Sequence, residues 1–358
     1  MRPLQCVCFN VLLQHGRHFL LLLLAVSPSL SSGNPASGRL TFTNGQFTLL
    51  QIADVHYGEA PDEAWGPEQD RKTDAAQFRL FDAVKPDLVV FSGDQVTGNN
   101  VQDALKATAL EKAYAPAVNA SLRWASVLGN HDDAALEGGT QEAAPALRRS
   151  LVEFERSAFG ERGSFTCSTP GACPEMLAPG VSNYWLLLGD DRPRVLLWFL
   201  DSGGGSCPEQ LPKPTMKWLA REAASLRATH GELPALTFVH IPPPEYLAAR
   251  AAGGDSCLGL AEDAVTPTKG RNALVKTLEA AGGARAVFVG HDHGNAWCCP
   301  YSSLHLCFGR HSGYGGYGDW ARGGRVVRLS LDPASKGGVA VRTWVHLEDG
   351  SVSDEQWL

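Results

Sequence analysis

The sequence predicts an α/β fold, and three observations lead to that class. Short apolar, β-branched runs recur along the chain, and each ends abruptly in Asp, Asn or His, often beside Gly. Helix-like stretches lie between these runs, and strands that alternate with helices are typical of α/β sheets. A content of 44% hydrophobic and 19% charged residues supports a sizeable core and excludes a mostly disordered chain.

Five of the runs are predicted to be buried strands, because they are too short for helices and are flanked by glycine. These strands cover residues 47–56, 87–94, 124–132, 235–240 and 285–293. Helices are predicted between them at residues 70–84, 104–118, 213–229 and 271–281. Open α/β sheets bind ligands beyond the carboxyl ends of their strands, so the polar residues that follow the runs are candidates for a functional site.

The remaining segments are assigned from the same patterns. A β-hairpin is predicted from residues 183–189 and 194–201, and further antiparallel strands from residues 303–309, 324–332 and 337–350. Residues 134–182 lack clear periodicity, which indicates an insertion over one end of the sheet, with a helix at 145–159. One domain is predicted over residues 46–350, with a linker at 33–45 before it and a tail at 351–358 after it.

The N-terminus predicts a secretory signal peptide over residues 1–32. Its apolar block, residues 19–26, is well below the ~18 residues needed to span a bilayer. The block follows Arg2 and Arg17 and precedes a run of small residues. We therefore expect a secreted, vacuolar or lumenal protein with no membrane span in the mature chain; an uncleaved anchor or an overextended start is the alternative. The same route would expose Asn119, which begins an Asn-Ala-Ser triplet, to glycosylation.

Seven cysteines follow the predicted signal, and an oxidising compartment favours disulfides among them. Cys167 and Cys173 bracket a Pro-Gly loop that a short bridge could close. Cys298 and Cys299 lack a Cys-x-x-Cys partner pair, so a disulfide to Cys307 is predicted in preference to a zinc site. Because seven is an odd number, one thiol stays free or pairs between chains.

The charge balance narrows the class of partner. The chain has 31 basic and 38 acidic residues, a net charge of −7, and no basic run stands out. A protein that binds long nucleic acids is therefore not expected. No serine nucleophile elbow, P-loop or dinucleotide fingerprint is present in the sequence.

A set of histidines, carboxylates and one asparagine follows the predicted strands. Imidazole together with carboxylate favours divalent or trivalent transition metals over the oxygen-only shells of calcium and magnesium. With one carboxylate shared, seven such groups supply four ligands to each of two metals. Two metals ~3.5–4 Å apart form a clamp for in-line displacement at phosphorus. The predicted ligands are Asp54, His56, Asp94, Asn130, His240, His291 and His293.

The order of these motifs resembles the calcineurin-like metallophosphoesterase superfamily. The sequence around the motifs, which includes HIPPPEY and GRHSGYGGYG, resembles the purple-acid-phosphatase-like branch of that superfamily, found in plants, algae and fungi. The resemblance covers roughly residues 45–350 and implies a four-layer α/β/β/α sandwich, with two mixed central sheets flanked by helices. The motifs run Asp54-x-His56, Gly93-Asp94, Gly129-Asn130-His131-Asp132, His240 and Gly290-His291-x-His293.

The resemblance also implies a role for each position. Asp94 would bridge the two metals, while His131 would face the phosphoryl oxygens or protonate the leaving group. Asp132 would orient the imidazole of His131. The first metal would be held by Asp54, His56 and His293, and the second by Asn130, His240 and His291.

The chain departs from true purple acid phosphatases in one ligand. Those enzymes carry a coloured tyrosine ligand in the second motif and lack a histidine in the first. Here the second motif reads Gly93-Asp94-Gln95-Val96-Thr97, and His56 stands in the first motif. The number of ligands is preserved, so we expect a colourless centre of Fe, Zn or Mn, and the missing tyrosine alone does not imply inactivity.

The function implied is hydrolysis of small phosphate esters, with monoesters favoured, by in-line attack of a hydroxide held by the metals. One alternative is a phosphodiesterase that acts on small nucleotides or phosphodiesters, because the same clamp serves both reactions. Another is a catalytically silent member that binds phosphorylated ligands; it predicts lost metal ligands, and none is lost here. His311 and Tyr314 are candidates for lining the pocket. The alternative for His311 is an ordinary surface position, and the alternative for Tyr314 is a turn-rich connection whose tyrosines pack on the sheet. The sequence does not indicate the oligomeric state.

Overall fold

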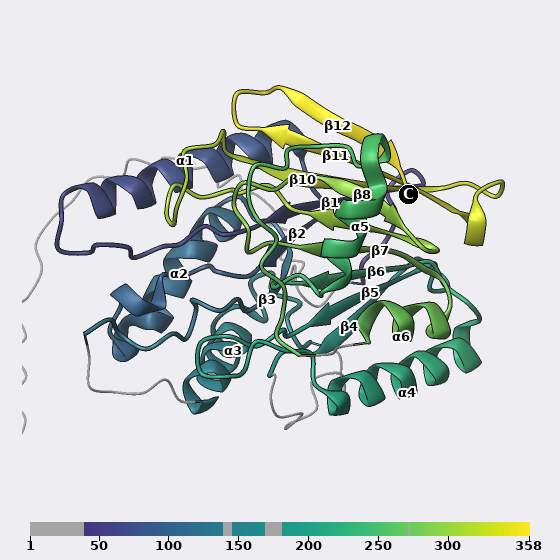
Figure 1. Cartoon of the computed structure of the whole chain (residues 1–358), viewed down its shortest axis with the longest axis horizontal. Coiled ribbons are helices and arrows are strands. Elements are labelled where there is room, and N and C mark those ends of the chain that lie inside the picture. The colour runs from purple at the N-terminus through teal and green to yellow at the C-terminus, as the bar shows by residue number, and fades with distance from the viewer. Residues whose placement is uncertain (1–38, 139–144, 169–180, 271–272) are drawn as a thin grey trace, which may run out of the picture. The chain divides into compact units, whose positions relative to one another are not determined.

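The computed structural model describes residues 39–138, 145–168, 181–270 and 273–358 (Figure 1). The chain divides into two units, residues 1–33 and 34–358, and every described residue belongs to the second unit. The predicted signal peptide and Cys173 lie outside the described residues. Across the described ranges, none of the helices combines the length and the apolar character that a membrane crossing requires.

Two six-stranded sheets form the centre of the described fold, with β1, β2 and β3 parallel in one sheet and β5, β6 and β7 parallel in the other (Figure 1). The first sheet has the order β12-β11-β10-β1-β2-β3: β1 Gln46–Ile52, β2 Leu88–Ser92, β3 Trp124–Val127, β10 Gly323–Leu331, β11 Val339–Leu347 and β12 Val352–Trp357. The second has the order β4-β5-β6-β7-β9-β8: β4 Tyr184–Leu188, β5 Val195–Leu200, β6 Ala235–Val239, β7 Ala284–Val289, β8 Cys298–Tyr301 and β9 Leu304–Phe308.

Helices flank both sheets. On the side of the first sheet, α1 contacts β10, β11 and α2, and α2 contacts α3; on the side of the second, α5 contacts β8, and α6 contacts β7 and α4. The four-layer α/β/β/α arrangement with two mixed sheets is therefore confirmed. The helices are α1 Trp65–Val84, α2 Asp103–Asn119, α3 Pro145–Phe159, α4 Lys213–His230, α5 Glu245–Gly253 and α6 Leu274–Ala281.

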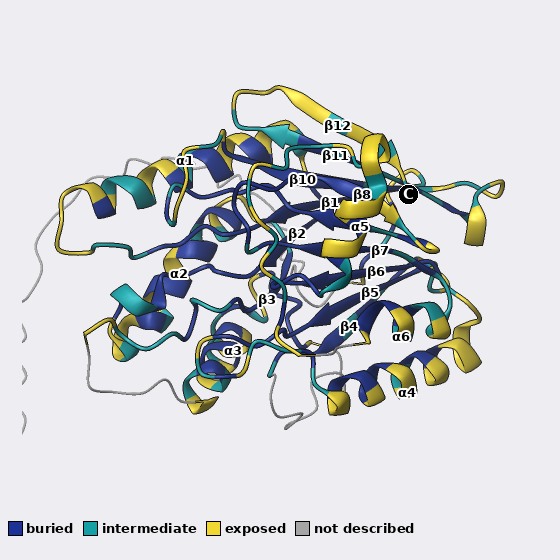
Figure 2. Ribbon diagram, in the orientation of Figure 1, coloured by how far each residue is buried: buried dark blue, intermediate teal, exposed yellow. Residues whose placement is uncertain are grey.

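The central strands of the second sheet are apolar on both faces because each face meets a different hydrophobic cluster. Along β5, Leu197 and Phe199 join the core that the two sheets share, whereas Leu196, Trp198 and Leu200 join the cluster under the helices of the second sheet. Such continuous runs are typical of strands covered on both sides. Figure 2 shows the result, with buried central strands and an exposed edge strand β12.

A row of four aromatic rings fixes the register of the second sheet. Tyr184, Phe199, Phe238 and Phe288 are paired across neighbouring strands from β4 to β7, with ring centroids 4.6, 5.4 and 5.2 Å apart. Aromatic pairs of this kind contribute about 0.5–1.5 kcal/mol each beyond the area they bury. Because register sets where each strand ends, this row helps to place the loops that follow β6 and β7.

Most predicted elements are present, and the differences lie at their ends. The helix predicted at residues 145–159 is confirmed, while α1 begins at Trp65 rather than at residue 70. The strand predicted at 303–309 pairs antiparallel with β8 but parallel with β7. Helix α5 and strand β8 were not predicted. Asn119, the candidate glycosylation site, is the last residue of α2 and is exposed.

The predicted boundaries of the domain are corrected at three places. The tail expected at 351–358 contains β12, which pairs antiparallel with β11. Leu40 and Phe42, expected in a linker, are buried in the core. The segment expected as an insertion provides α3, which packs on α2 and buries charged side chains. These residues are parts of the domain rather than additions to it.

Two disulfides lie beside the loop after β7. The predicted bridge to Cys307 is made by Cys298, whereas Cys299 pairs with Cys257, a partner that was not predicted. Cys167 is disulfide-bonded, although its predicted partner is outside the described residues. Among the described cysteines, Cys207 is the free thiol, and it is buried.

Candidate metal centre

The predicted site residues lie on loops that follow five strand ends, three in the first sheet and two in the second. Strands β1, β2 and β3 lead into the loops at residues 53–56, 93–97 and 128–133. Strands β6 and β7 lead into His240 and residues 290–293. Because these strands run parallel within each sheet, their carboxyl ends meet at one edge, and the two edges face each other.

Two groups of metal-binding side chains form where these loops meet. The ligand atoms of Asp54, His56 and His293 lie within 4.8 Å of one another, and so do those of Asp94, His240 and His291. Each group takes ligands from both sheets.

Asp94 lies between the two groups. Its Oδ2 atom is 3.1 Å from Nε2 of His240 in one group and 3.7 Å from Nε2 of His56 in the other. Asn130 is also close, with Oδ1 3.0 Å from Nε2 of His240. The structure thus brings together all seven side chains that the sequence singled out as ligands, with Asp94 where a shared carboxylate is needed.

Hydrogen bonds on the far side of each ring orient three of the imidazoles. Nδ1 of His240 lies 2.9 Å from the carbonyl oxygen of Ser92, and Nδ1 of His293 lies 2.9 Å from that of Tyr317. A carbonyl partner requires a proton on Nδ1 and leaves Nε2 free for a cation. Nδ1 of His56 lies 3.2 Å from the hydroxyl of Thr97, which is in the second motif.

Backbone amides fix the carboxylates. Both oxygens of Asp54 accept from the backbone N–H of His291, at 3.0 and 3.2 Å. Oδ1 of Asp94 accepts from the backbone N–H of His131 at 2.8 Å, which leaves Oδ2 directed at the imidazoles. Each carboxylate is therefore held by a residue from another ligand-bearing loop.

The ligand loops hold several residues in a strained backbone conformation. Asp54, His56, Asp94 and His291 all have positive φ, at 58, 52, 54 and 77°. Non-glycine residues in this region cost about 1–3 kcal/mol each, and they cluster at functional sites. The loops keep this shape through bonds between them, such as those from the backbone N–H groups of Asp54 and His56 to the carbonyls of Gly93 and Asp94.

Two motif glycines are required by close packing against ligands. A Cβ at Gly93 would lie 2.2 Å from Nδ1 of His240, and one at Gly129 would lie 2.1 Å from Oδ1 of Asp94. No side chain fits at either position without displacing a ligand. The glycines of the Gly-Asp and Gly-Asn-His-Asp motifs therefore serve the ligands directly.

Burial and neighbouring charges set the protonation states of the site. Burial lowers the pKa of His291 to about 3 and of His293 to about 4, so both rings are neutral near pH 7, the form that binds metals. Burial also raises the pKa of the Asp54 carboxyl, because nothing in the protein fully replaces the water it loses. Burial opposes a charge on His240, but the Asp94 carboxylate outweighs it and raises the pKa of His240 to about 9. This mixture of buried carboxylate, amide and imidazole donors fits transition-metal cations.

The open side of the centre is formed by three half-buried residues, Asn130, His131 and His291, whereas the other five candidate ligands are buried. The ring of His131 lies edge-on to that of His56, with centroids 5.1 Å apart. His131 is therefore on the side from which a substrate can approach.

The partner predicted for His131 is corrected. Nδ1 of His131 lies 3.0 Å from Oδ1 of Asn99, a residue that sequence reasoning did not select. Asp132 instead accepts from the backbone N–H groups of Asp94 and Gly129, at 3.1 and 2.6 Å, and of Val96 at 2.9 Å. Asp132 thus ties the second motif to the third, and Asn99 occupies the position expected for the orienting group.

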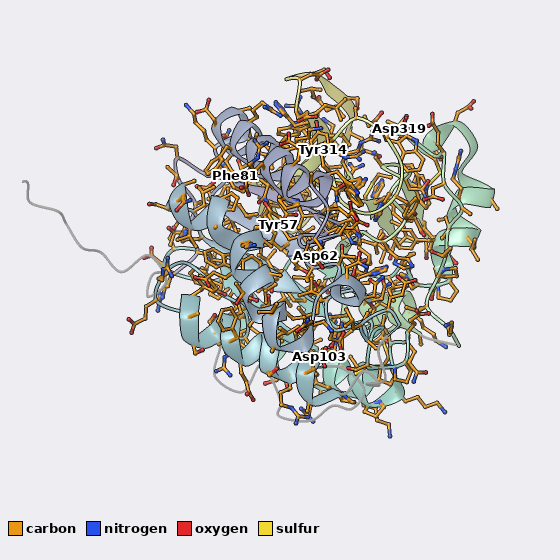
Figure 3. All side chains as sticks on the ribbon, turned by 90° about the vertical axis from the view of Figure 1, so that its left-hand side faces the viewer. Tyr57, Asp62, Phe81, Asp103, Tyr314 and Asp319 are labelled. Atoms are coloured by element: carbon orange, nitrogen blue, oxygen red, sulfur yellow. A yellow bond between two sulfur atoms is a disulfide. The ribbon has the colours of Figure 1, made fainter. Side chains whose placement is uncertain are left out.

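Of the two residues expected to line the pocket, one lies at the centre and the other does not. His311 is buried with its ring centroid 3.9 Å from that of His293, so it packs directly behind a ligand. Tyr314 lies beside α1, where its hydroxyl donates to Glu348 and its backbone N–H to Thr73 (Figure 3). Tyr314 is therefore not part of the centre.

Tyr317, in the same GYGGYG segment, takes the position expected for Tyr314. Its ring stacks on His293 with centroids 4.1 Å apart and an interplanar angle of 10°. Its hydroxyl accepts from the backbone N–H of His293 at 3.0 Å and donates to Asp263. The segment was recognisable from its glycines and aromatics, but the choice between the two tyrosines depends on the fold of the loop.

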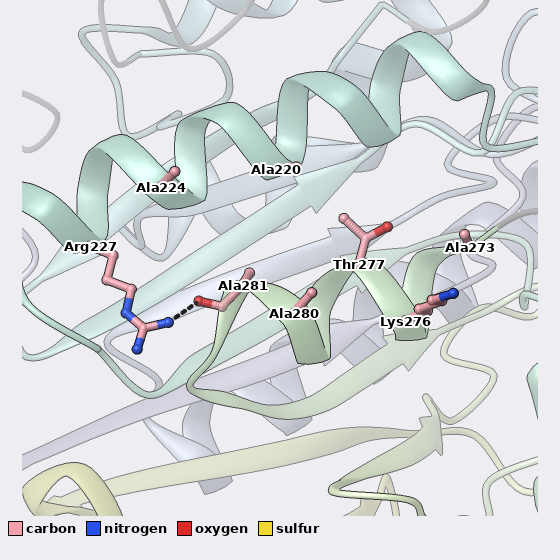
Figure 4. Close-up of a pocket in the computed structure, with 8 residues that line it drawn as sticks. All are labelled: Ala220, Ala224, Arg227, Ala273, Lys276, Thr277, Ala280 and Ala281. Atoms are coloured by element: carbon pink, nitrogen blue, oxygen red, sulfur yellow. Dashed lines mark hydrogen bonds between the residues drawn. The ribbon is translucent and has the colours of Figure 1, made fainter.

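A separate groove lies between α4 and α6, where the second sheet is covered (Figure 4). It has a volume of about 500 Å³ and is lined mainly by alanines, and Arg227 reaches across its end to the carbonyl of Ala281 at 3.5 Å. None of its lining residues belongs to the metal centre.

Comparisons with known proteins identify relatives of the chain and of its fold. "Probable inactive purple acid phosphatase 29" of Arabidopsis thaliana is 30% identical over 88% of this chain and 86% of its own length. Two solved structures, each 13% identical in sequence, share the fold. A dimetal phosphatase from Danio rerio aligns with a TM-score of 0.54 over 87% of this chain and 98% of its own. Purple acid phosphatase PPD1 from yellow lupin, Lupinus luteus, aligns with a TM-score of 0.50 over 87% of this chain and 53% of its own. The sequence profile of the calcineurin-like phosphoesterases matches residues 47–295, and the chain belongs to that family.

Proposed function

We propose that the protein hydrolyses phosphate esters, with monoesters preferred, at a centre of two Fe, Zn or Mn ions. The observation that carries the proposal is the position of Asp94, whose carboxylate lies between two groups of ligands, both within reach of its Oδ2 atom. The first ion would be held by Asp54, His56, Asp94 and His293, and the second by Asp94, Asn130, His240 and His291. Bound ions of this kind lower the pKa of bound water and neutralise charge on phosphoryl oxygens.

His131 supplies the acid–base group of the proposed reaction. Its position on the open side of the centre allows its ring to contact a phosphoryl oxygen or the oxygen of the leaving alcohol. Because Asn99 faces Nδ1, the other ring nitrogen is the one available to the substrate. Asn99 is a neutral partner, so it orients the ring without adding charge, and protonated His131 can donate a proton to the leaving group.

A catalytically silent protein remains the competing proposal, since the Arabidopsis relative carries "inactive" in its name. The complete ligand set argues against it here. A protein that binds no metal gains nothing from strained backbone conformations at these positions, yet four residues of this centre have positive φ.

We also propose that the protein works in the secretory pathway. Two disulfides between described cysteines support an oxidising compartment, and the predicted signal peptide and the exposed Asn119 triplet agree with it. Expression in a eukaryotic secretory host should yield protein that lacks residues 1–32, which N-terminal sequencing would establish.

The deciding experiment compares p-nitrophenyl phosphate with its bis ester, using protein stripped by a chelator and then reloaded with Mn, Zn or Fe. We expect faster hydrolysis of the monoester, loss of activity on stripping and recovery on reloading. A faster diester reaction would establish the phosphodiesterase alternative. Protein that holds two metals per chain yet hydrolyses neither ester would establish the silent alternative.

A further inference from the structure

Arg148 of α3 is a fully buried cation that contacts the loop carrying Asn130 and His131. Its guanidinium donates to the carbonyl oxygens of Leu128 and Gly129, at 3.0 and 2.8 Å. These two carbonyls immediately precede Asn130. A side chain from a helix outside the two sheets therefore reaches the backbone that places a predicted ligand.

The charge of Arg148 is balanced by two buried carboxylates. It donates to Asp201 twice, at 3.0 and 2.7 Å, and to Asp133 at 2.6 Å. Asp133 follows Asn130 by three residues, and Asp201 begins the loop after β5. With two carboxylates around one guanidinium, the cluster carries a net negative charge and does not repel a nearby cation.

The loop after β5 packs closely against the backbone and Cβ of Asn130. A Cβ at Gly204 would lie 2.2 Å from Cβ and 2.5 Å from Cα of Asn130, and φ at Gly204 is 97°. The backbone N–H of Ser206 donates to Asp133 at 3.1 Å, and the Arg148–Asp201 contact holds the start of the same loop. Asn130 is thus enclosed between its own loop and this glycine turn, and Arg148 connects the two.

We propose that Arg148 is a positioning residue for the second metal site, and that it acts through Asn130. The inference rests on the proposed dinuclear centre. A guanidinium can bond the two carbonyls and both carboxylates at once because its donors form a rigid, planar fork. Lysine at this position keeps the charge but cannot satisfy all of these acceptors, so the Asn130 amide loses its fixed placement.

The test is a double-mutant cycle that measures cation binding. Metal-free wild type, Arg148→Lys, Asn130→Ala and the double variant are titrated with Zn²⁺ against a chromophoric chelator, which resolves two dissociation constants. We expect Arg148→Lys to weaken one site by roughly 10–100-fold and leave the other unchanged. In the Asn130→Ala background the Arg148→Lys change should have no further effect, because the group through which it acts is absent.

Glu155→Gln provides the matched control on the same helix. Glu155 is buried in a hydrogen-bonded network with Trp124 and Ser126 of β3 and with Thr166, so its bonds reach the strand rather than the carbonyls of the loop after it. We expect this variant to lower the unfolding midpoint and to keep both zinc affinities. Equal weakening of both sites in Arg148→Lys, full additivity in the cycle, or the same selective loss in Glu155→Gln would show that Arg148 is only structural.

A second variant covers the case in which Arg148→Lys does not fold. Gly204→Ala forces a methyl group against Asn130, so it should weaken the same site selectively, and unchanged zinc affinities in that variant would overturn the inference.

The readout of these tests is zinc binding rather than ester hydrolysis, so the two proposals can fail separately. Wild type that binds two ions but hydrolyses no ester would refute the proposed function alone. Wild type that binds fewer than two ions would refute both proposals.

Discussion

Oδ2 of Asp94 lies 3.1 Å from Nε2 of His240, while Oδ1 of the same carboxylate accepts the backbone N–H of His131. One side chain thus contacts a candidate ligand of the second group and fixes the loop that carries His131, the proposed acid–base group. We expect Asp94→Ala to lose both ions and all turnover. Elemental analysis of the purified variant measures this, with Asp82→Ala, an exposed aspartate of α1, as the control. Full metal content in Asp94→Ala would contradict the shared role.

His131 is expected to matter for turnover but not for metal. We predict that His131→Ala retains two ions and slows monoester hydrolysis by about 10²–10⁴-fold, as for the loss of a general acid. Steady-state kinetics and metal analysis on the same preparation test this. An empty site in His131→Ala would show that the ring is a ligand instead.

Asn99 offers a way to change the proton affinity of His131. Oδ1 of Asn99 lies 3.0 Å from Nδ1 of that ring. In Asn99→Asp, a carboxylate beside the ring favours the imidazolium form of His131. We expect the alkaline limb of the pH–rate profile for monoester hydrolysis to move to higher pH, and Asn99→Ala to lower the rate without that displacement. An unmoved limb in Asn99→Asp would exclude His131 as the proton donor.

Removal of the ions should make stability depend on pH above neutrality. In the metal-free protein, burial opposes the charge on His240, but Asp94 raises the pKa of that ring from 6.5 to about 9. The folded state therefore holds a proton that the unfolded chain releases, so the stabilisation is complete below pH 6.5 and is lost as the pH rises to about 9. Asp54, whose pKa burial also raises, acts in the same direction.

Thermal melts of chelator-treated protein at pH 6.5 and 9 measure this effect. We expect a lower melting temperature at pH 9, a smaller difference after zinc is added, and a shallower dependence in metal-free His240→Asn. A metal-free wild type that melts higher at pH 9 than at pH 6.5 would contradict the expected sign.

The Cys257–Cys299 disulfide should stabilise the loop after β7. Residues 258–262 pair with 294–298 through backbone bonds such as Ala296 N–H to the carbonyl of Leu260, at 2.8 Å, next to His293. A bridge that closes a loop of this length contributes about 2–4 kcal/mol to folding. We expect a Cys257→Ser/Cys299→Ser variant to lose this amount in urea unfolding, whereas Cys207→Ser, which removes the free buried thiol, should lose less. Equal losses would indicate that the bridge does not constrain the chain.

The side chains of the candidate metal centre could be brought together from sequence because each stands in a short motif at the end of an apolar run. A strand signal and a polar residue directly after it are local properties of the chain, and parallel strands bring such ends together regardless of the intervening sequence. The ligand His293 and its neighbours were therefore found without knowledge of the loops between strands. The disulfide to Cys307 was predicted on different grounds, because Cys298 and Cys299 lack a Cys-x-x-Cys partner pair that would complete a zinc site.

The residues around the ligands could not be predicted, because their roles depend on how loops fold against one another. Asp132 follows His131 in sequence, yet a tight turn directs its carboxylate back to the N–H of Gly129. Asn99 reaches His131 only because the chain turns after the second motif, in the 3₁₀ helix at Gly98–Asn100. Strand β12 was taken for a tail because its edge position leaves it polar and exposed, without the alternation that indicates a strand.

Each proposed ion draws its ligands from both sheets, since Asp54, Asp94 and Asn130 follow strands of one and His240, His291 and His293 follow strands of the other. Cations bound there would act as cross-links between the two halves of the sandwich at a single edge. In the described part of the chain, the opposite ends of these strands are joined across the sheets by hydrogen bonds, such as those from Arg285 to the carbonyl oxygens of Lys336 and Leu358. Breathing of the loaded protein should still begin at that opposite edge, where amide protons would exchange with solvent first.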